Sequence, residues 1–177
     1  MAKKTRKMLG AADSPCILSL MALIQTQSKK TIANWCMDYA ETHILPIYEK
    51  HRPGDERPRH ALMAARDWLQ GHVKLPFVKN IILNEAHAAA RENEDYPVAQ
   101  AAARAVGQAA SSIHTPTHSL GVAFYGAAAI AYDRAGVGAS PETYDRIASE
   151  VFAGMEAALR AAAVENEPNP AKINWYC

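Results

Sequence analysis

Apolar residues recur at spacings of three and four along most of the chain, which is the periodicity of α-helices with one buried face. Runs that alternate apolar and polar residues, as β-strands do, are nearly absent. Proline and glycine fall where such helices would begin and end. The pattern predicts an all-α fold: a compact, alanine-rich bundle of about seven helices joined by short Pro/Gly turns.

Start and stop signals divide the chain into the expected helices. Ser140, Pro141 and Glu142 supply an N-cap, a first helical position and a first-turn acid. Pro46 removes a backbone donor near the end of the second helix, so we expect a kink or an end there. The helices are expected near residues 15–26, 28–46, 55–70, 76–93, 97–109, 118–136 and 141–164.

We expect a single domain, because 177 residues fit one hydrophobic core. The expected division is a flexible basic N-terminal tail at 1–14, a single helical domain at 15–164, and an irregular C-terminal tail at 165–177. The last of these contains Ile173, Trp175 and Tyr176, which are too apolar for a free chain end. We therefore expect these three residues to dock on the body of the protein or on a partner.

Charge and composition narrow the functional classes. Nineteen basic and eighteen acidic residues leave a formal charge of +1, whereas nucleic-acid-binding surfaces usually show a clustered basic excess, so we expect no nucleic-acid partner. The apolar stretch at 120–132 is shorter than the roughly 20 residues of a membrane span, so we expect no membrane association. Cys16, Cys36 and Cys177 are odd in number and widely spaced, which argues against a disulfide framework and favours a reducing cytoplasm.

Large polar residues stand out in a chain otherwise crowded with alanine. Small side chains let helices approach closely, so bulky charged groups among them form either a satisfied interior network or a binding site. Arg59 and Arg66 are seven residues apart on roughly one helix face, where guanidinium groups could bind an anion or a carboxylate. The alternative is an Asp–Arg lattice within the chain that fixes the preceding turn. The candidate residues are Asp55, Arg57, Arg59, Arg66, His87, Arg91, His114 and His118.

The histidines allow a further interpretation. His87 and Arg91 share a helix face four residues apart, and His114 and His118 flank the junction before the next helix. With Glu85 nearby, His87, His114 and His118 could hold a divalent metal, because imidazole and carboxylate groups suit zinc or iron. Their spacing is not that of HExxH, so we expect no metal and no other cofactor.

Two other motifs indicate little chemistry. Cys36 and His43 could act as thiol and base, but their seven-residue spacing equally places Cys36 in the core, the common position of a free cysteine. Gly136 and Gly138 lack the third glycine and the preceding strand of a dinucleotide-binding fingerprint.

A set of segments suggests a family. They are residues 35–68, in which the Asp-x-Arg-Pro-Arg turn at 55–59 is the most particular piece, and residues 87–91, 102–105, 114 and 118–120. Together they resemble the Imm-5-like immunity proteins of bacterial polymorphic toxin systems, over about residues 30–135. The first 28 residues and the tail from Gly136 lie outside the likeness. The resemblance implies a compact helical protein, encoded near toxin genes, that binds and silences a toxin, and it implies no catalytic residues.

The resulting prediction is a non-enzymatic interaction protein that binds and neutralises a bacterial toxin, with the eight polar residues on its binding face. The alternative is a helical hydrolase, or a protein that binds a small molecule or a metal, using the same cluster as a pocket. A third interpretation is a homodimer whose alanine-rich faces form the subunit interface.

Overall fold

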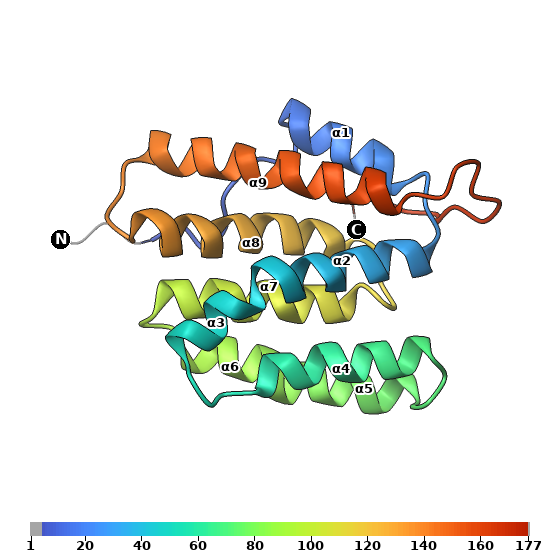
Figure 1. Cartoon of the computed structure of the whole chain (residues 1–177), viewed down its shortest axis with the longest axis horizontal. Coiled ribbons are helices and arrows are strands. Elements are labelled where there is room, and N and C mark those ends of the chain that lie inside the picture. The colour runs from blue at the N-terminus through green and yellow to red at the C-terminus, as the bar shows by residue number, and fades with distance from the viewer. Residues whose placement is uncertain (1–4, 177) are drawn as a thin grey trace.

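The computed structural model describes residues 5–176, and over that range it contains helices and loops but no strand (Figure 1). The all-α prediction is confirmed. The elements are α1 (Pro15–Ile24), α2 (Lys29–His43), α3 (Leu45–His51), α4 (Arg57–Leu69), α5 (Leu75–Ile81), the π-helical turn η1 (Ile82–Ala86), α6 (His87–Glu92), α7 (Pro97–Ser111), α8 (His118–Ala135) and α9 (Pro141–Ala162).

Two of the expected helices are each divided in the structure. The expected helix at 28–46 is α2 followed by α3, and the break lies at Ile44, where φ is −115° and ψ is −47°. Pro46 occupies the first turn of α3, where its missing N–H has no helical bond to lose. The chain therefore kinks and continues to His51, so the kink is the one of the two expected outcomes that the structure shows.

The expected helix at 76–93 is α5, η1 and α6 in succession. Four of its buried residues, Val78, Ile82, Ala86 and Ala90, recur every four positions. In a regular α-helix of 3.6 residues per turn, each four-residue step would rotate the buried face by about 40°. The π turn, in which the His87 N–H bonds to the Ile82 carbonyl, has more residues per turn and keeps this face toward the core.

Helix α7 is the centre of the bundle. It packs against α2, α3, α4, α6, η1 and α8, whereas α1 packs on α9 at one side of the molecule and α4, α5 and α6 form the other (Figure 1). Between Ala99 and Ile113, every residue is buried except Arg104 and Gln108. Alanine and glycine supply most of this burial, because small side chains let neighbouring helices approach closely.

The segments at both chain ends lie against the bundle. Leu9 is fully buried and its N–H donates to the Phe124 carbonyl at 3.2 Å, so the N-terminal segment contacts α8 at this residue. Burial of this apolar side chain stabilises the contact. The expected flexibility over 1–14 stays a prediction. Residues 1–4 of that tail, and Cys177, lie outside the described residues.

No helix is found after Ala162 in the described residues. The segment is tied back to the bundle through Gln27, whose carbonyl accepts from the Ala171 N–H at 2.8 Å. Ile173 and Trp175 pack against the core, which confirms their docking on the body, whereas Tyr176 is 97% exposed. Within residues 5–176, no helix combines the length and the apolar character that a membrane span needs.

Candidate functional site

The eight candidate residues lie in two groups. Asp55, Arg57, Arg59 and Arg66 belong to α4 and the turn before it. His87 and Arg91 belong to α6, His114 to the α7–α8 connection, and His118 to the first position of α8. The structure therefore divides the predicted set, and each group is described with its own contacts.

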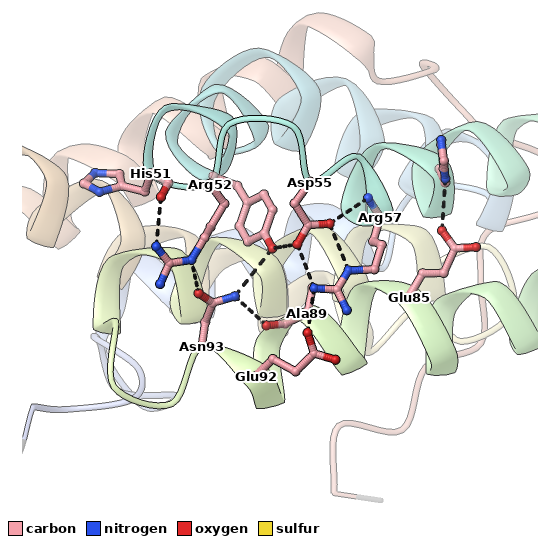
Figure 2. Close-up of polar contacts among 10 residues, drawn as sticks. His51, Arg52, Asp55, Arg57, Glu85, Ala89, Glu92 and Asn93 are labelled. Atoms are coloured by element: carbon pink, nitrogen blue, oxygen red, sulfur yellow. Dashed lines mark hydrogen bonds and ion pairs between the residues drawn. The ribbon is translucent and has the colours of Figure 1, made fainter.

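Asp55 is the centre of the first group (Figure 2). Its carboxylate accepts the Tyr48 hydroxyl at 2.6 Å, the Arg57 N–H at 3.2 Å, the Arg57 Nε at 2.9 Å and the Arg57 Nη2 at 2.7 Å. The Arg57 hydrogen bonds hold the pKa of Asp55 well below its usual range. Burial, followed by the bond to Asp55, raises the pKa of Tyr48. Arg57 also pairs with Glu92 of α6 at 2.8 Å.

The same network continues to the start of α7. The Asn93 side chain accepts from Arg52 Nε and donates to the Ala89 carbonyl at 2.8 Å (Figure 2). The Arg52 guanidinium stacks on the Tyr96 ring, 3.8 Å from its centroid. These contacts join α3, α4, α6 and α7, so the Asp-x-Arg-Pro-Arg turn forms the Asp–Arg lattice that was one of the two predicted alternatives.

The other two arginines of α4 are also paired within the chain. Arg59 binds Glu49 of α3 at 2.7 Å. Arg66 binds Asp38 at 2.8 Å and Glu41 at 2.6 Å, both on α2. An external carboxylate at either guanidinium would therefore compete with carboxylates that are already bound.

The second group lies around the accessible edge of α7, where Arg104 and Gln108 reach the surface. His118 donates from Nδ1 to the Gln108 side-chain oxygen at 2.7 Å, and the His114 and His118 ring centroids lie 5.8 Å apart. The His87 ring lies over Gly107, where an added Cβ would come within 2.8 Å of its Cε1 atom. The Nδ1 atom of His114 is buried and has no hydrogen-bond partner among the described residues.

The surroundings of these imidazoles are cationic. Burial lowers the pKa of His87, and Arg91, His118 and Arg104 lower it further. Burial also lowers the pKa of His114, with smaller effects from Lys79 and His118, and burial alone lowers that of His118. We call the following residues the cationic face: Lys79, His87, Arg91, Arg104, Gln108, His114 and His118.

The three cations of this face have no direct ion-pair partner among the described residues, although Arg91 lies close enough to Glu92 to help lower the pKa of that carboxyl. Lys79, Arg91 and Arg104 form no ion pair with any residue between positions 5 and 176. Arg91 makes a long contact to the Leu83 carbonyl at 3.4 Å, and the Arg104 guanidinium lies 5.7 Å from the centre of the Tyr125 ring. The face therefore has donors available for an anionic group.

The alternative metal and nucleophile sites are not supported by the geometry. Across the part of the chain that the structure describes, no three His, Cys, Asp or Glu side chains are arranged to hold a metal ion, and this applies to His87, His114 and His118. Cys36 is fully buried and burial raises the pKa of its thiol well above the usual range. His43 packs instead on the Tyr39 ring, with centroids 4.5 Å apart.

A surface cavity of about 400 Å³ lies between α2, α3, α8 and α9, away from both groups. Its polar lining comes from Tyr39, His43, Asp133, Arg134 and Glu150. Asp133 is already paired with Lys50 and His51, and Arg134 with Glu150. None of the eight candidate residues lines this cavity.

Arg104 and Gln108 were missed by sequence reasoning, although a signal was available. Gln100, Arg104 and Gln108 are the only long polar side chains of α7, and they recur every four residues among alanines. Gln100 is buried and donates to the Ala90 carbonyl at 3.1 Å, whereas the other two reach the surface. A four-residue polar stripe in an otherwise apolar helix indicates its single accessible edge.

Comparison with known proteins identifies the family. No curated protein and no solved structure shows a significant match to this chain. The family model described as "Imm-5 like putative immunity protein" matches residues 22–158. The match begins in α1 and ends in α9, so the family pattern is longer than the expected 30–135 and includes helices that the resemblance had left out. Because the match spans most of the 177 residues, the chain belongs to the Imm-5-like immunity protein family.

Proposed function

We propose that this protein is an immunity protein that binds a protein toxin and silences it by occupying its surface, with no reaction of its own. The family match over residues 22–158 is the observation on which the proposal rests, since membership implies a toxin partner in general. The contacts of the candidate catalytic groups support the absence of turnover. Asp55 is held by Arg57 and Tyr48, and the Cys36 thiol is buried.

The proposed toxin-binding surface is the cationic face and excludes the turn at Asp55. Four of the eight predicted residues, His87, Arg91, His114 and His118, belong to it. The arginines of the first group are matched by carboxylates from α2, α3 and α6 and the preceding turn. Specific recognition needs donors that are free before the partner arrives, and such donors lie on the cationic face.

The proposal includes a cytoplasmic location, where the protein would meet an incoming toxin. The cysteine pattern supports it, because Cys16 and Cys36 are both free thiols in the structure. A homodimer is not required by the proposal, and sedimentation equilibrium of the purified protein measures it directly.

Growth rescue tests the proposal. Toxin genes adjacent to the gene for this chain are expressed from an inducible promoter, with and without the chain. We expect the chain to restore growth against one of them and to co-purify with that toxin in a fixed ratio. Mass spectrometry should find the recovered toxin chemically unchanged. Absence of rescue for every neighbouring toxin, or a toxin that is covalently modified in proportion to time, would contradict the proposal.

A further inference from the structure

Most of the cationic face is a strip formed by α6, α7 and α8, with Lys79 on α5 and His114 in the α7–α8 connection. Helix α7 contributes its only accessible residues between Ala99 and Ile113, Arg104 and Gln108. Helix α6 borders them with His87 and Arg91, and helix α8 with His118, which is bonded to Gln108. Helices α6 and α8 each pack directly on α7, so these helical polar groups are held on a rigid surface.

Two glycines make this arrangement sterically possible. Gly107 leaves room for the His87 ring, and a Cβ at Gly121 would lie 2.7 Å from Cγ of Gln108. Both occur inside helices that are otherwise rich in alanine. A glycine costs about 1 kcal/mol relative to alanine in a helix interior. The chain thus has the weaker helix former at the two positions where a methyl group would displace His87 or Gln108.

A π turn lies immediately before His87. Such turns are rare and occur frequently at functional sites. In this chain η1 ends at Ala86, and His87 is the next residue and the first of α6. Two independent backbone features, Gly107 and the π turn, therefore lie next to the same imidazole, that of His87.

The cations of the face differ in their pairing from the arginines of α4. Arg57, Arg59 and Arg66 each have a carboxylate partner at 2.8 Å or less. Lys79, Arg91 and Arg104 have none between residues 5 and 176, although the chain holds 18 acidic residues for 19 basic ones. A local excess of cations in a nearly neutral protein fits a partner that supplies carboxylates.

Resting on the proposed function, we infer that the cationic face binds an acidic segment of the toxin, whose carboxylates pair with Arg91 and Arg104 while the adjacent imidazoles take up protons. A nucleic acid fits less well, because the only cation–π contact that these cations make among residues 5–176 is that of Arg104 with Tyr125, and this ring is therefore already covered.

Proton uptake follows from the groups that face the imidazoles. In the free protein, burial and the neighbouring Arg91, Arg104 and His118 keep the pKa of His87 low, so its ring is neutral near pH 7. His118, whose Nδ1–H is bound to Gln108, has Nε2 as its remaining site for a proton. Carboxylates nearby raise both pKa values, so binding must become tighter as the pH falls.

The test uses the full chain and a fluorescein-labelled oligoglutamate peptide as the probe, measured by fluorescence anisotropy at low salt. We expect binding that tightens at least about threefold from pH 7.5 to pH 6.0, since one linked proton gives up to tenfold per pH unit. The R91Q/R104Q variant should bind at least about threefold more weakly. The R146Q/R160Q variant is the matched control, because it removes two exposed cations from α9. It should bind as the wild type does.

The wild-type protein provides a readout that needs no variant. Imidazole NMR resonances of His87 and His118 should move on peptide addition, and their pKa values should rise. The inference is overturned if binding is independent of pH, if both double variants weaken equally, or if a single-stranded oligonucleotide binds this face more tightly than the peptide.

The two proposals fail separately. If the wild type rescues growth and the charge-reversed variant R91E/R104E rescues equally well, the inference is wrong and the immunity function stands. If the peptide binds as described and no neighbouring toxin is neutralised, the acidic-partner face stands and the immunity function is wrong.

Discussion

Replacing Asp55 with alanine removes the acceptor that joins α3 to α4. Four hydrogen bonds end on this carboxylate, and one of them satisfies the hydroxyl of the fully buried Tyr48. A hydrogen bond to a charged group contributes about 1.5 to 3 kcal/mol, and loss of a capping acceptor at a helix start costs about 1 kcal/mol. These values do not add fully, because Arg57 keeps Glu92 and the Tyr48 hydroxyl keeps Asn93 at 3.5 Å.

We therefore expect D55A to lower the free energy of unfolding by about 3 kcal/mol. For a domain of this size, that loss corresponds to a fall in Tm of about 6 to 12 °C. Urea denaturation followed by circular dichroism at 222 nm measures the first quantity, and calorimetry the second. E92A is the matched control, because the Glu92 side chain is 62% exposed and its removal should leave most of the stability intact.

The pH dependence gives a second measurement of the same carboxylate. The pKa of Asp55 is depressed in the folded protein, so its ionised form stabilises the fold above the unfolded-state pKa of about 3.9. That contribution is lost as the pH falls through the folded-state pKa. The difference in stability between wild type and D55A should be constant from pH 7 to 5 and should shrink below pH 4.

A double-mutant cycle with Y48F isolates the hydroxyl–carboxylate bond. If the network is structural, D55A should cost less in the Y48F background than in the wild type, by about 1 kcal/mol or more. A D55A variant that keeps wild-type stability, or a cycle with no coupling, would refute the reasoning. The turn would then be free to bind a ligand, as the first of the two sequence interpretations supposed.

Three further predictions concern other parts of the chain. G107A should displace the His87 ring into solvent, although alanine is the better helix former, and should thereby raise the pKa of His87 toward its ordinary value. An NMR titration in which the pKa of His87 is unchanged would contradict this packing. Q27A should remove the bond from the Val164 N–H at 2.7 Å and the bond to its carbonyl at 3.2 Å, and hydrogen exchange should then accelerate at residues 163–171 but not inside α9. The Cys36 thiol should resist Ellman's reagent in the native protein and react only on unfolding. The thiol that reacts only on unfolding should be absent in C36A.

Local sequence signals predicted most of the fold, because proline, serine and glycine determine helix starts and ends within a few residues of their own position. Ser140 caps α9, accepting the Thr143 N–H at 3.3 Å. The expected start of α9 at residue 141 is therefore confirmed. The choice between a kink and an end at Pro46 was left open by the sequence, and the π turn at Ile82–Ala86 was not predicted. Both features depend on which face of the helix packs against α7, and the packing of the whole bundle determines that face.

The partners of the site residues were less predictable than the helices. Arg66 binds Asp38 and Glu41 of α2, which lie 28 and 25 positions earlier, and no local sequence rule predicts that pairing. The four-residue spacing of His87 and Arg91 did predict a shared face, because it depends on one helix only. That Arg104 of α7 belongs to the same surface as His87 and Arg91 could be seen only in the three-dimensional structure. Its four-residue spacing from Gln108 indicates only that both lie on one edge of α7.

The Asp-x-Arg-Pro-Arg turn is the most family-specific segment, but the free energy of replacing its internal ion pairs with a partner's carboxylates disfavours it as the binding site. A toxin carboxylate that approached Arg57 would replace Asp55 and Glu92 with an equivalent group, so it would gain little. It would also leave Asp55 ionised, 20% exposed and without its main partner, and an unpaired charge in that position is destabilising. At Arg91 and Arg104 no internal ion pair has to break. The full interaction with an incoming carboxylate is then available for binding, and this difference favours the cationic face over the Asp-x-Arg-Pro-Arg turn.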